Sequence, residues 1–240
     1  MNIKRIELDI IDSTSTYIKQ NLDKLESFTF VYANQQNSGH GRMSREWESE
    51  YGKNILLSFL IKDDELTKSF DSLSLLIATS IYKLLRSYGV ENVKIKWPND
   101  VMVGDKKIAG ILLEGSLPNY IIIGVGININ QKTLKYGNAI SLFNLLNQEF
   151  SLDKIKDDIE KIIKNDISDF RNDKFNYLKL YKSVDYLIDK LVTFDYQNKK
   201  LTGIVLGVDE CNKIMIQTNN QTLHISCGEI SLNKWFIKIF

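Results

Sequence analysis

The chain has 240 residues, of which 43% are hydrophobic and 25% are charged. This composition is ordinary for a globular protein, and the length allows one large domain together with a small one. The 31 basic and 30 acidic residues leave a formal net charge of +1. That balance argues against a general nucleic-acid-binding protein, because such a protein gathers a basic surplus on one face.

The sequence shows neither a sorting signal nor a membrane segment. No apolar stretch follows the basic pair at positions 4 and 5, so no secretory signal is expected. The most apolar run, Tyr120 to Ile127, is far too short to span a bilayer. Cys211 and Cys227 lack the partners that would make a zinc site. We therefore expect a cytoplasmic protein in which both thiols are free.

The first half of the chain alternates predicted strands and helices. Residues 12–14 are all N-cap types, which predicts that a short helix begins there. Apolar residues at helical spacing predict a core-facing helix over 69–88. The segment 120–128 is apolar on both faces, which is typical of a central strand. The predicted elements are helices over 15–25 and 69–88 and strands over 28–33, 54–62, 93–96, 107–114 and 120–128.

The second half changes character at about Leu191. Two helices with one polar face are predicted before it, and short strands separated by turn residues follow it. Several short strands in so short a stretch favour a small β-barrel. We place a large domain at residues 1–186 and a small C-terminal domain at residues 187–240. The predicted elements are helices over 151–170 and 174–181 and strands over 191–195, 200–208, 213–217, 221–225 and 234–240.

The polar segment 36–47 combines glycines with arginines. Gly39 and Gly41 allow backbone N–H groups to approach an anion closely. Arg42 and Arg45 offer charge-assisted donors for a phosphate or a carboxylate. A Gly-x-Gly pattern is a weak signal by itself, so this segment also fits an ordinary surface loop.

Three further motifs follow along the chain. In the segment Lys96-Trp97-Pro98-Asn99-Asp100, Trp-Pro favours an extended backbone and Asn-Asp favours a turn, which fits the corner of a β-hairpin. Lys107, near the start of a predicted strand, can direct its ammonium into a cleft while the apolar residues after it anchor the sheet. Gly124 and Gly126 lie inside an apolar strand, where glycine usually marks close approach to another group.

Together these motifs resemble the biotin–protein ligase family. They occur in the family's order and at its spacings, and the resemblance covers about residues 5 to 233. The matching segments are Asp12-Ser13-Thr14, Gln36 to Trp47, Lys96 to Asp100, Lys107 to Glu114, Gly124 to Asn128 and, as the family's last strand, Gly228-Glu229-Ile230-Ser231-Leu232.

The resemblance implies an α+β fold. Its main part is a mixed β-sheet flanked by helices, of the kind shared by class II aminoacyl-tRNA synthetases and biotin ligases, and its C-terminal part is a small SH3-like β-barrel. Bifunctional members of the family carry an additional N-terminal DNA-binding domain. Since the present sequence starts at the catalytic domain, we expect a monofunctional ligase with no nucleic-acid partner. The choice between a monomer and a homodimer stays open.

The resemblance also implies a reaction in two steps. Biotin and ATP give biotinyl-5′-AMP and pyrophosphate, and the biotinyl group then passes to a lysine of a biotin carboxyl carrier domain of a biotin-dependent carboxylase. ATP brings Mg²⁺ with it, and no metal is expected to be held by protein side chains alone. Adenylation brings a carboxylate against a phosphate, so positioning and relief of anionic charge should dominate catalysis.

For catalysis, the resemblance points to Arg42 and Lys107 as the cations that stabilise charge, and to Asp100 as a polar group near the acceptor lysine. Ser13, Thr14 and Gln36 match the positions around the biotin ring, and the backbone of the glycine loop is expected near the carboxylate and phosphate. Ser15 stands where the family often has Asn, so we expect it to line the site with a weaker contact. The predicted substrate site is Ser13, Thr14, Ser15, Gln36, Gly39, His40, Gly41, Arg42, Trp47, Lys107, Gly110 and Asn128.

His40 departs from the family pattern, which usually has Arg in this position of the glycine loop. A histidine is shorter and mostly neutral at pH 7, so it holds an anionic adenylate less strongly. Asn233 is a second departure, since some relatives have Arg there.

Three other functions compete with that of a biotin–protein ligase. A lipoate or octanoate ligase or transferase would share the fold, but it uses a different glycine motif, and both cysteines fall outside the core that octanoyl transferases use. A non-catalytic biotin-binding module would not need Arg42 and Lys107. A DNA-binding repressor is disfavoured by the net charge.

Overall fold

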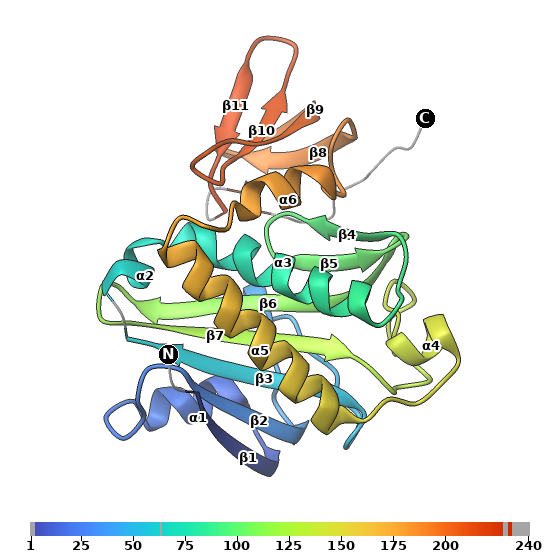
Figure 1. Ribbon diagram of the computed structural model, residues 1–240. Helices are drawn as coiled ribbons and strands as arrows, with labels where there is room; N and C mark the ends of the chain where they lie inside the picture. The colour runs from blue at the N-terminus through green and yellow to red at the C-terminus, as the bar shows by residue number, and fades with distance from the viewer. Residues whose placement is uncertain (1–2, 63, 228–229, 232–240) are drawn as a thin grey trace.

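The computed structural model describes residues 3–62, 64–227 and 230–231. Within these residues the chain forms a mixed α+β fold that contains two separate sheets (Figure 1). The larger sheet has seven strands in the order β1-β2-β3-β7-β6-β5-β4. Only β1 and β2 run parallel to each other, and the other neighbours are antiparallel. Its strands are β1 (Lys4–Ile11), β2 (Thr29–Gln36), β3 (Asn54–Ile61), β4 (Val93–Lys96), β5 (Asp100–Val103), β6 (Lys106–Ser116) and β7 (Tyr120–Asn128).

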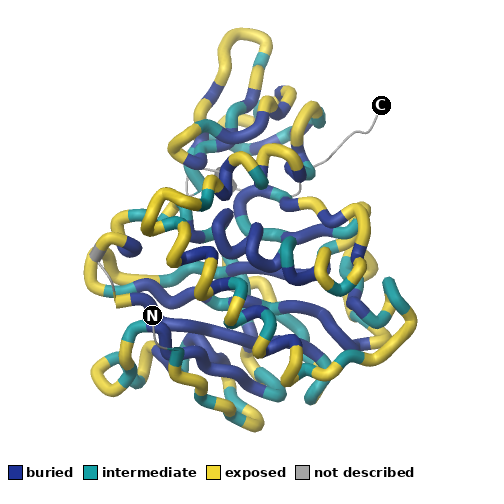
Figure 2. Tube along the Cα trace, viewed as in Figure 1, coloured by how far each residue is buried: buried dark blue, intermediate teal, exposed yellow. Residues whose placement is uncertain are grey.

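Two long helices cover one face of this sheet. The helices α3 (Phe70–Ser87) and α5 (Leu152–Arg171) lie across the strands in Figure 1, and the residues between helices and sheet form a continuous buried core (Figure 2). In α5, Ile155, Ile159 and Ile163 recur every four residues and are fully buried, which gives the helix one apolar face. The short helices are α2 (Asp64–Lys68), α4 (Leu142–Leu146) and α6 (Tyr177–Ser183).

A smaller cluster lies on the opposite face of the sheet. The helix α1 (Thr14–Gln20) packs there against β3 and β7, and its Ile18 is buried with Val31, Leu60 and Ile122. Ser13 caps this helix by accepting a hydrogen bond from the Thr16 amide. Because α1 is short, it covers only part of this face. The remainder is open for a binding site.

Most of the predicted elements of the large sheet are confirmed. The strands over 93–96 and 120–128 have the predicted bounds, and β7 is the central strand of the seven. The prediction missed β1 and β5. The strand β1 is an edge strand whose residues are largely exposed, and the alternation of polar and apolar residues from Arg5 to Ile10, which is typical of a strand, was overlooked. The strand β5 has only four residues and directly follows a turn.

The second sheet has the strand order β11-β10-β9-β8-β12 and is antiparallel throughout. The small barrel predicted for this region is not closed within the described residues, because β11 and β12 remain as two separate edges. The strand predicted over 234–240, and with it Gly228, Glu229, Leu232 and Asn233, lies outside the described residues. The strands are β8 (Leu191–Tyr196), β9 (Lys199–Val208), β10 (Ile214–Gln217), β11 (Thr222–Ile225) and β12 (Ile230–Ser231).

The small sheet is joined to the large one by buried polar contacts. Residues 184–186 pair with Ile95 and so cover the outer edge of β4. Asn212, in a turn of the small sheet, accepts a hydrogen bond from the Tyr177 hydroxyl at 2.8 Å and donates one to Ser72 at 3.1 Å. Its carbonyl accepts the indole N–H of Trp97 at 3.0 Å. Asn212 therefore connects the small sheet with α6, α3 and the end of β4.

No helix in the described part of the chain is both long and apolar enough to cross a bilayer.

The contacts of Asn212 predict a large stability effect for Asn212→Ala. The variant loses two buried side-chain hydrogen bonds and places alanine at a φ of 62°, so the free energy of unfolding should fall by about 2–3 kcal/mol. Asn198→Ala is the matched control, because Asn198 has a φ of 60° but is exposed, and its loss should be about 1 kcal/mol. Urea denaturation measures the free energy of unfolding of both variants, and an equal loss in the two would contradict the buried role of Asn212.

Candidate active site

A cavity of about 540 Å³ opens on the face of the large sheet that carries α1. Its floor is formed by the inner strands β6 and β7, where three glycines stand in place of side chains. Gly110 pairs directly with Gly126, and Gly124 pairs with Leu112, so these residues form two adjacent rows on the same face. The missing side chains allow the Trp47 ring, the Lys107 ammonium and the Ser15 hydroxyl to approach the floor of the cavity closely.

One of these rows continues outward across the sheet. Gly126 is followed by Gly110 on β6, by Asp100 on β5 and by Lys96 on β4, each directly opposite the next. Residues directly opposite each other in antiparallel strands point to the same face. The row therefore changes from backbone alone in the middle of the sheet to a carboxylate and an ammonium at its edge.

Buried hydroxyl groups form one end of the cavity. The Ser58 hydroxyl lies 2.7 Å from the Thr14 hydroxyl and 2.9 Å from that of Ser15. The Gln36 carboxamide oxygen accepts hydrogen bonds from the amide of Thr14 at 2.8 Å and from its hydroxyl at 3.0 Å. Ser13 is also buried here. The cluster offers several donors and acceptors to a small polar ligand group at the buried end of the site.

The glycine loop is an ordered hairpin rather than an irregular surface segment. Trp47 donates its amide to the Gly39 carbonyl at 2.8 Å, and Gly41 donates to the Arg45 carbonyl at 2.7 Å. The tip contains a short 3-10 turn, η1 (Arg42–Ser44), in which Met43 has a φ of 56°. This hairpin forms one wall of the cavity.

Trp47 lies directly on the glycine floor. A Cβ at Gly126 would overlap its indole ring, and a Cβ at Gly110 would lie 3.1 Å from its Cζ3 atom. The Lys107 ammonium stands 5.3 Å from the centre of the ring. Within the described residues, the buried indole nitrogen has no hydrogen-bond partner. The two glycines therefore allow a flat aromatic ring to sit against the sheet with one donor unused.

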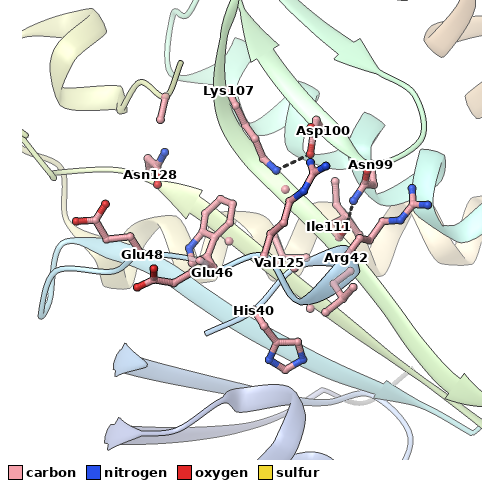
Figure 3. Close-up of a pocket in the computed structure, with 18 of the residues that line it drawn as sticks. His40, Arg42, Glu46, Glu48, Asn99, Asp100, Lys107, Ile111, Val125 and Asn128 are labelled. Carbon is pink, nitrogen blue, oxygen red and sulfur yellow. Dashed lines mark hydrogen bonds and ion pairs between the residues drawn. The ribbon is translucent and has the colours of Figure 1, made fainter. Parts of the chain in front are cut away.

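Lys107 and Asp100 form the charged centre of the site. The Lys107 ammonium lies 2.6 Å from Oδ1 of Asp100, and both side chains are about one-third exposed (Figure 3). The pair bridges β6 and β5, so the sheet itself positions the ammonium. The backbone of Lys107 is also paired with residues 138–140, which fixes that segment as a second wall.

Arg42 connects the loop to the C-terminal sheet. One guanidinium nitrogen, Nη2, donates to the Cys227 carbonyl at 2.9 Å, whereas the buried Nη1 has no partner in the described parts of the chain. A buried guanidinium donor without a partner is costly, because a charged group that leaves water needs compensation. Arg42 therefore has a donor available for an anion in the cavity.

His40 and Asn128 line the cavity at its margins. The His40 ring points away from Lys107 and Asp100 in Figure 3, with its Nε2 at 3.6 Å from Oε2 of Glu114. Asn128 donates its amide to the Ile140 carbonyl at 3.1 Å, so its side chain holds the second wall. Every residue predicted for the site lines the cavity except Gly39, which is buried behind it between Gln36 and the Trp47 carbonyl.

The sequence reasoning missed several polar residues that line this cavity, among them Ser58 and Lys96. Ser58 lies in the middle of β3, and no local pattern distinguishes it from a serine that fits a buried strand. Lys96 belongs to a motif whose Asn-Asp pair indicates a turn, and its position opposite Asp100 follows only from the hairpin register. Both residues point into the cavity because of their row in the sheet.

The described residues contain no group of three or more His, Cys, Asp or Glu side chains placed to hold a metal ion. The polar groups that line the cavity include hydroxyls, amides, ammonium and guanidinium groups, and the carboxylates of Glu46, Glu48 and Asp100.

Comparison with known proteins agrees with this geometry. Residues 7–128 match the family described as the Biotin/lipoate A/B protein ligase family. These residues include β1 to β7, the glycine loop and the Lys107–Asp100 pair. The chain belongs to this family.

Individual relatives cover nearly the whole chain. The bifunctional ligase/repressor BirA of Salmonella typhimurium is 30% identical over 94% of this chain and 73% of its own length. The biotin–[acetyl-CoA-carboxylase] ligase of Mycobacterium tuberculosis is 25% identical over 83% and 77%. The structure of the biotin protein ligase from Aquifex aeolicus in complex with biotin and ATP superposes with a TM-score of 0.84 at 27% identity, covering 95% of this chain and 97% of the other.

The packing of Trp47 on the glycine floor predicts the outcome of Gly126→Ala. The new methyl group has no room beneath the indole, so Trp47 should leave the sheet and its fluorescence emission should shift to the red. The same change at Gly137, where the space is open, should leave the emission unaltered. A red shift that persists in a Trp47→Phe background would show that another tryptophan causes it.

Proposed function

We propose that this protein is an ATP-dependent ligase that activates biotin as biotinyl-5′-AMP and transfers the biotinyl group to a lysine of a biotin carboxyl carrier domain. One observation carries the proposal: a single cavity joins a buried hydroxyl cluster to a cationic centre, in a chain of the biotin/lipoate ligase family. Its volume of about 540 Å³ is in the ordinary range for a small-molecule site.

The hydroxyl cluster favours biotin over lipoate or octanoate. Biotin has a ureido group that both donates and accepts hydrogen bonds, whereas a fatty-acyl chain has none at its far end. Thr14, Ser15, Ser58 and Gln36 already hydrogen-bond to one another, and a ureido group can exchange further hydrogen bonds with them, whereas a fatty-acyl chain cannot. We therefore assign the biotin ring to this end of the cavity.

In the first step, a biotin carboxylate oxygen attacks the α-phosphorus of ATP and pyrophosphate leaves. The ring at the hydroxyl end directs the carboxylate toward the cationic centre, where Lys107 and Arg42 reduce the repulsion between two anions. The free Nη1 of Arg42 and the Lys107 ammonium are the donors proposed for the carboxylate and the α-phosphate. Trp47 and Asn128 are proposed to contact the nucleotide.

In the second step, the amine of the acceptor lysine attacks the acyl carbon and AMP leaves. The amine must lose a proton, and Asp100 is the carboxylate nearest to the proposed acyl position. Since Asp100 also pairs with Lys107 at 2.6 Å, it holds that ammonium in place during the first step. Mg²⁺ enters as part of the ATP substrate.

The proposal extends to architecture and partner. We assign the large sheet to the type shared by class II aminoacyl-tRNA synthetases and biotin ligases, with residues 1–186 as the catalytic domain and residues 187–240 as the small C-terminal domain. The acceptor is the carrier domain of a biotin-dependent carboxylase, consistent with the printed name of the Mycobacterium tuberculosis relative.

The decisive experiment is incubation with biotin, ATP, Mg²⁺ and a carboxylase carrier domain, followed by detection with labelled avidin. Labelling of the carrier that requires both biotin and ATP is the expected result. Modification of the carrier by lipoate instead of biotin, detected by the mass of the carrier, would move the protein to the other branch of its family. No labelling, even with preformed biotinyl-5′-AMP, would overturn the proposal.

The two cations yield a prediction of their own. Lys107→Ala and Arg42→Ala should each slow biotin-dependent ATP–pyrophosphate exchange by well over tenfold, since a lost charge-assisted contact costs about 1.5–3 kcal/mol. Lys106→Ala is the matched control, because Lys106 is the adjacent, exposed residue of the same strand. A comparable loss in Lys106→Ala would remove the assignment of Lys107.

A further inference from the structure

Lys96 is a cation of the cavity to which the proposed mechanism assigns no role. It is the last residue of β4 and stands directly opposite Asp100, at the outer end of the row that runs from Gly126 through Gly110. Its side chain is half-buried and lines the same cavity as Lys107. The sheet thus brings a second ammonium to the site, one strand further from the glycine floor.

Among the described residues, this ammonium has no close ion pair of its own. Asp100, the carboxylate opposite it, makes its close ion pair with Lys107 at 2.6 Å. Within the described ranges, no carboxylate forms an ion pair with Lys96, and its recorded contact is with the ring of Tyr186 at 5.9 Å. Lys96 is therefore partly removed from water without an anionic partner.

The surroundings of Lys96 are electropositive and partly shielded from water. Burial lowers the pKa of the Lys96 ammonium, and the positive charges of Lys107, Lys190 and Arg45 lower it further, while Asp100 acts in the opposite direction. Holding such cations close together is unfavourable in the free protein. An anion with more than one negative charge would relieve this repulsion, so the arrangement is typical of a site for a polyanion.

The proposed reaction supplies one polyanion at this place. The carboxylate and the α-phosphate are held between the glycine floor and Lys107, so the rest of the triphosphate must extend from there. Lys96 is one strand beyond Asp100, on the last strand of the sheet, and lines the same cavity. An ammonium is a compact charge that binds phosphate oxygens from several directions.

We propose that Lys96 is a further catalytic residue that binds the pyrophosphate portion of ATP and stabilises it as the leaving group. This inference rests on the proposed function of the same cavity. In the first step the biotin carboxylate forms a bond to the α-phosphorus while the bond from that phosphorus to the bridging oxygen breaks, and its electron pair moves onto the departing pyrophosphate. The Lys96 ammonium donates hydrogen bonds to those oxygens, where the negative charge increases.

This role separates the two steps of the reaction. Pyrophosphate has left before the acceptor lysine attacks, so the loss of Lys96 should impair only adenylate formation. A residue that contacts the carrier domain would instead affect the transfer step, and a residue that supports the fold would affect both.

The test compares Lys96→Met with Lys94→Met. Lys94 lies two residues earlier on β4, on the same face, and is exposed, so its replacement is the matched control. Three measurements are made on each full-length protein: calorimetric binding of inorganic pyrophosphate with Mg²⁺, biotin-dependent ATP–pyrophosphate exchange, and single-turnover transfer from purified biotinyl-5′-AMP to the carrier domain. Lys96→Arg, which keeps the charge, serves as a second variant if Lys96→Met folds poorly.

For Lys96→Met we expect at least tenfold weaker pyrophosphate binding and at least tenfold slower exchange, with transfer from biotinyl-5′-AMP within twofold of the wild type. Lys96→Arg should retain most of both properties, and Lys94→Met should behave like the wild type. Unchanged pyrophosphate binding in Lys96→Met, or an equal loss in both steps, would overturn the role of Lys96. A wild-type protein that neither activates biotin nor labels the carrier would overturn the proposed function itself.

Discussion

The site depends on the register between the two inner strands of the large sheet. Because β6 and β7 pair so that Gly110 faces Gly126 and Gly124 faces Leu112, the three glycines lie close together on one face and let Trp47, Lys107 and Ser15 approach the floor of the cavity. Glycine inside a strand is unfavourable by about 0.5–1 kcal/mol relative to alanine. A shift of one residue would turn these glycines to the opposite face, where α3 and α5 pack, and would close the cavity.

The same register arranges the charges around that hollow. Lys96, Asp100 and Gly110 follow each other across β4, β5 and β6, and Lys107 reaches Asp100 from the start of β6. Strands are stiff and paired along their length, so they hold these groups with little freedom. The hydroxyl cluster is held differently, because α1 brings Thr14 and Ser15 onto Ser58 of β3. A ligand with a polar ring at one end and an anionic group at the other fits both the hydroxyl cluster and the charged groups.

The C-terminal sheet takes part in the site through backbone rather than through charged side chains. The Cys227 carbonyl orients the Arg42 guanidinium, and Asn212 ties the same sheet to α3 and α6. A motif search gives no weight to such contacts, since any residue can supply a carbonyl oxygen. The link between Arg42 and residue 227 spans most of the chain and became visible only in the folded structure.

The sequence by itself determined the family resemblance, the central strand β7 and the helix α3, and every residue it predicted for the site except Gly39 lines the cavity, because several motifs in a fixed order are far more specific than any one of them. The tertiary structure decided what these residues do together. It shows that Ser58 and Lys96 line the cavity, that Gly39 lies behind it, and that the His40 ring faces Glu114. The physical reason is that side-chain direction follows from strand register and loop pairing, which are set by contacts between segments far apart in the sequence.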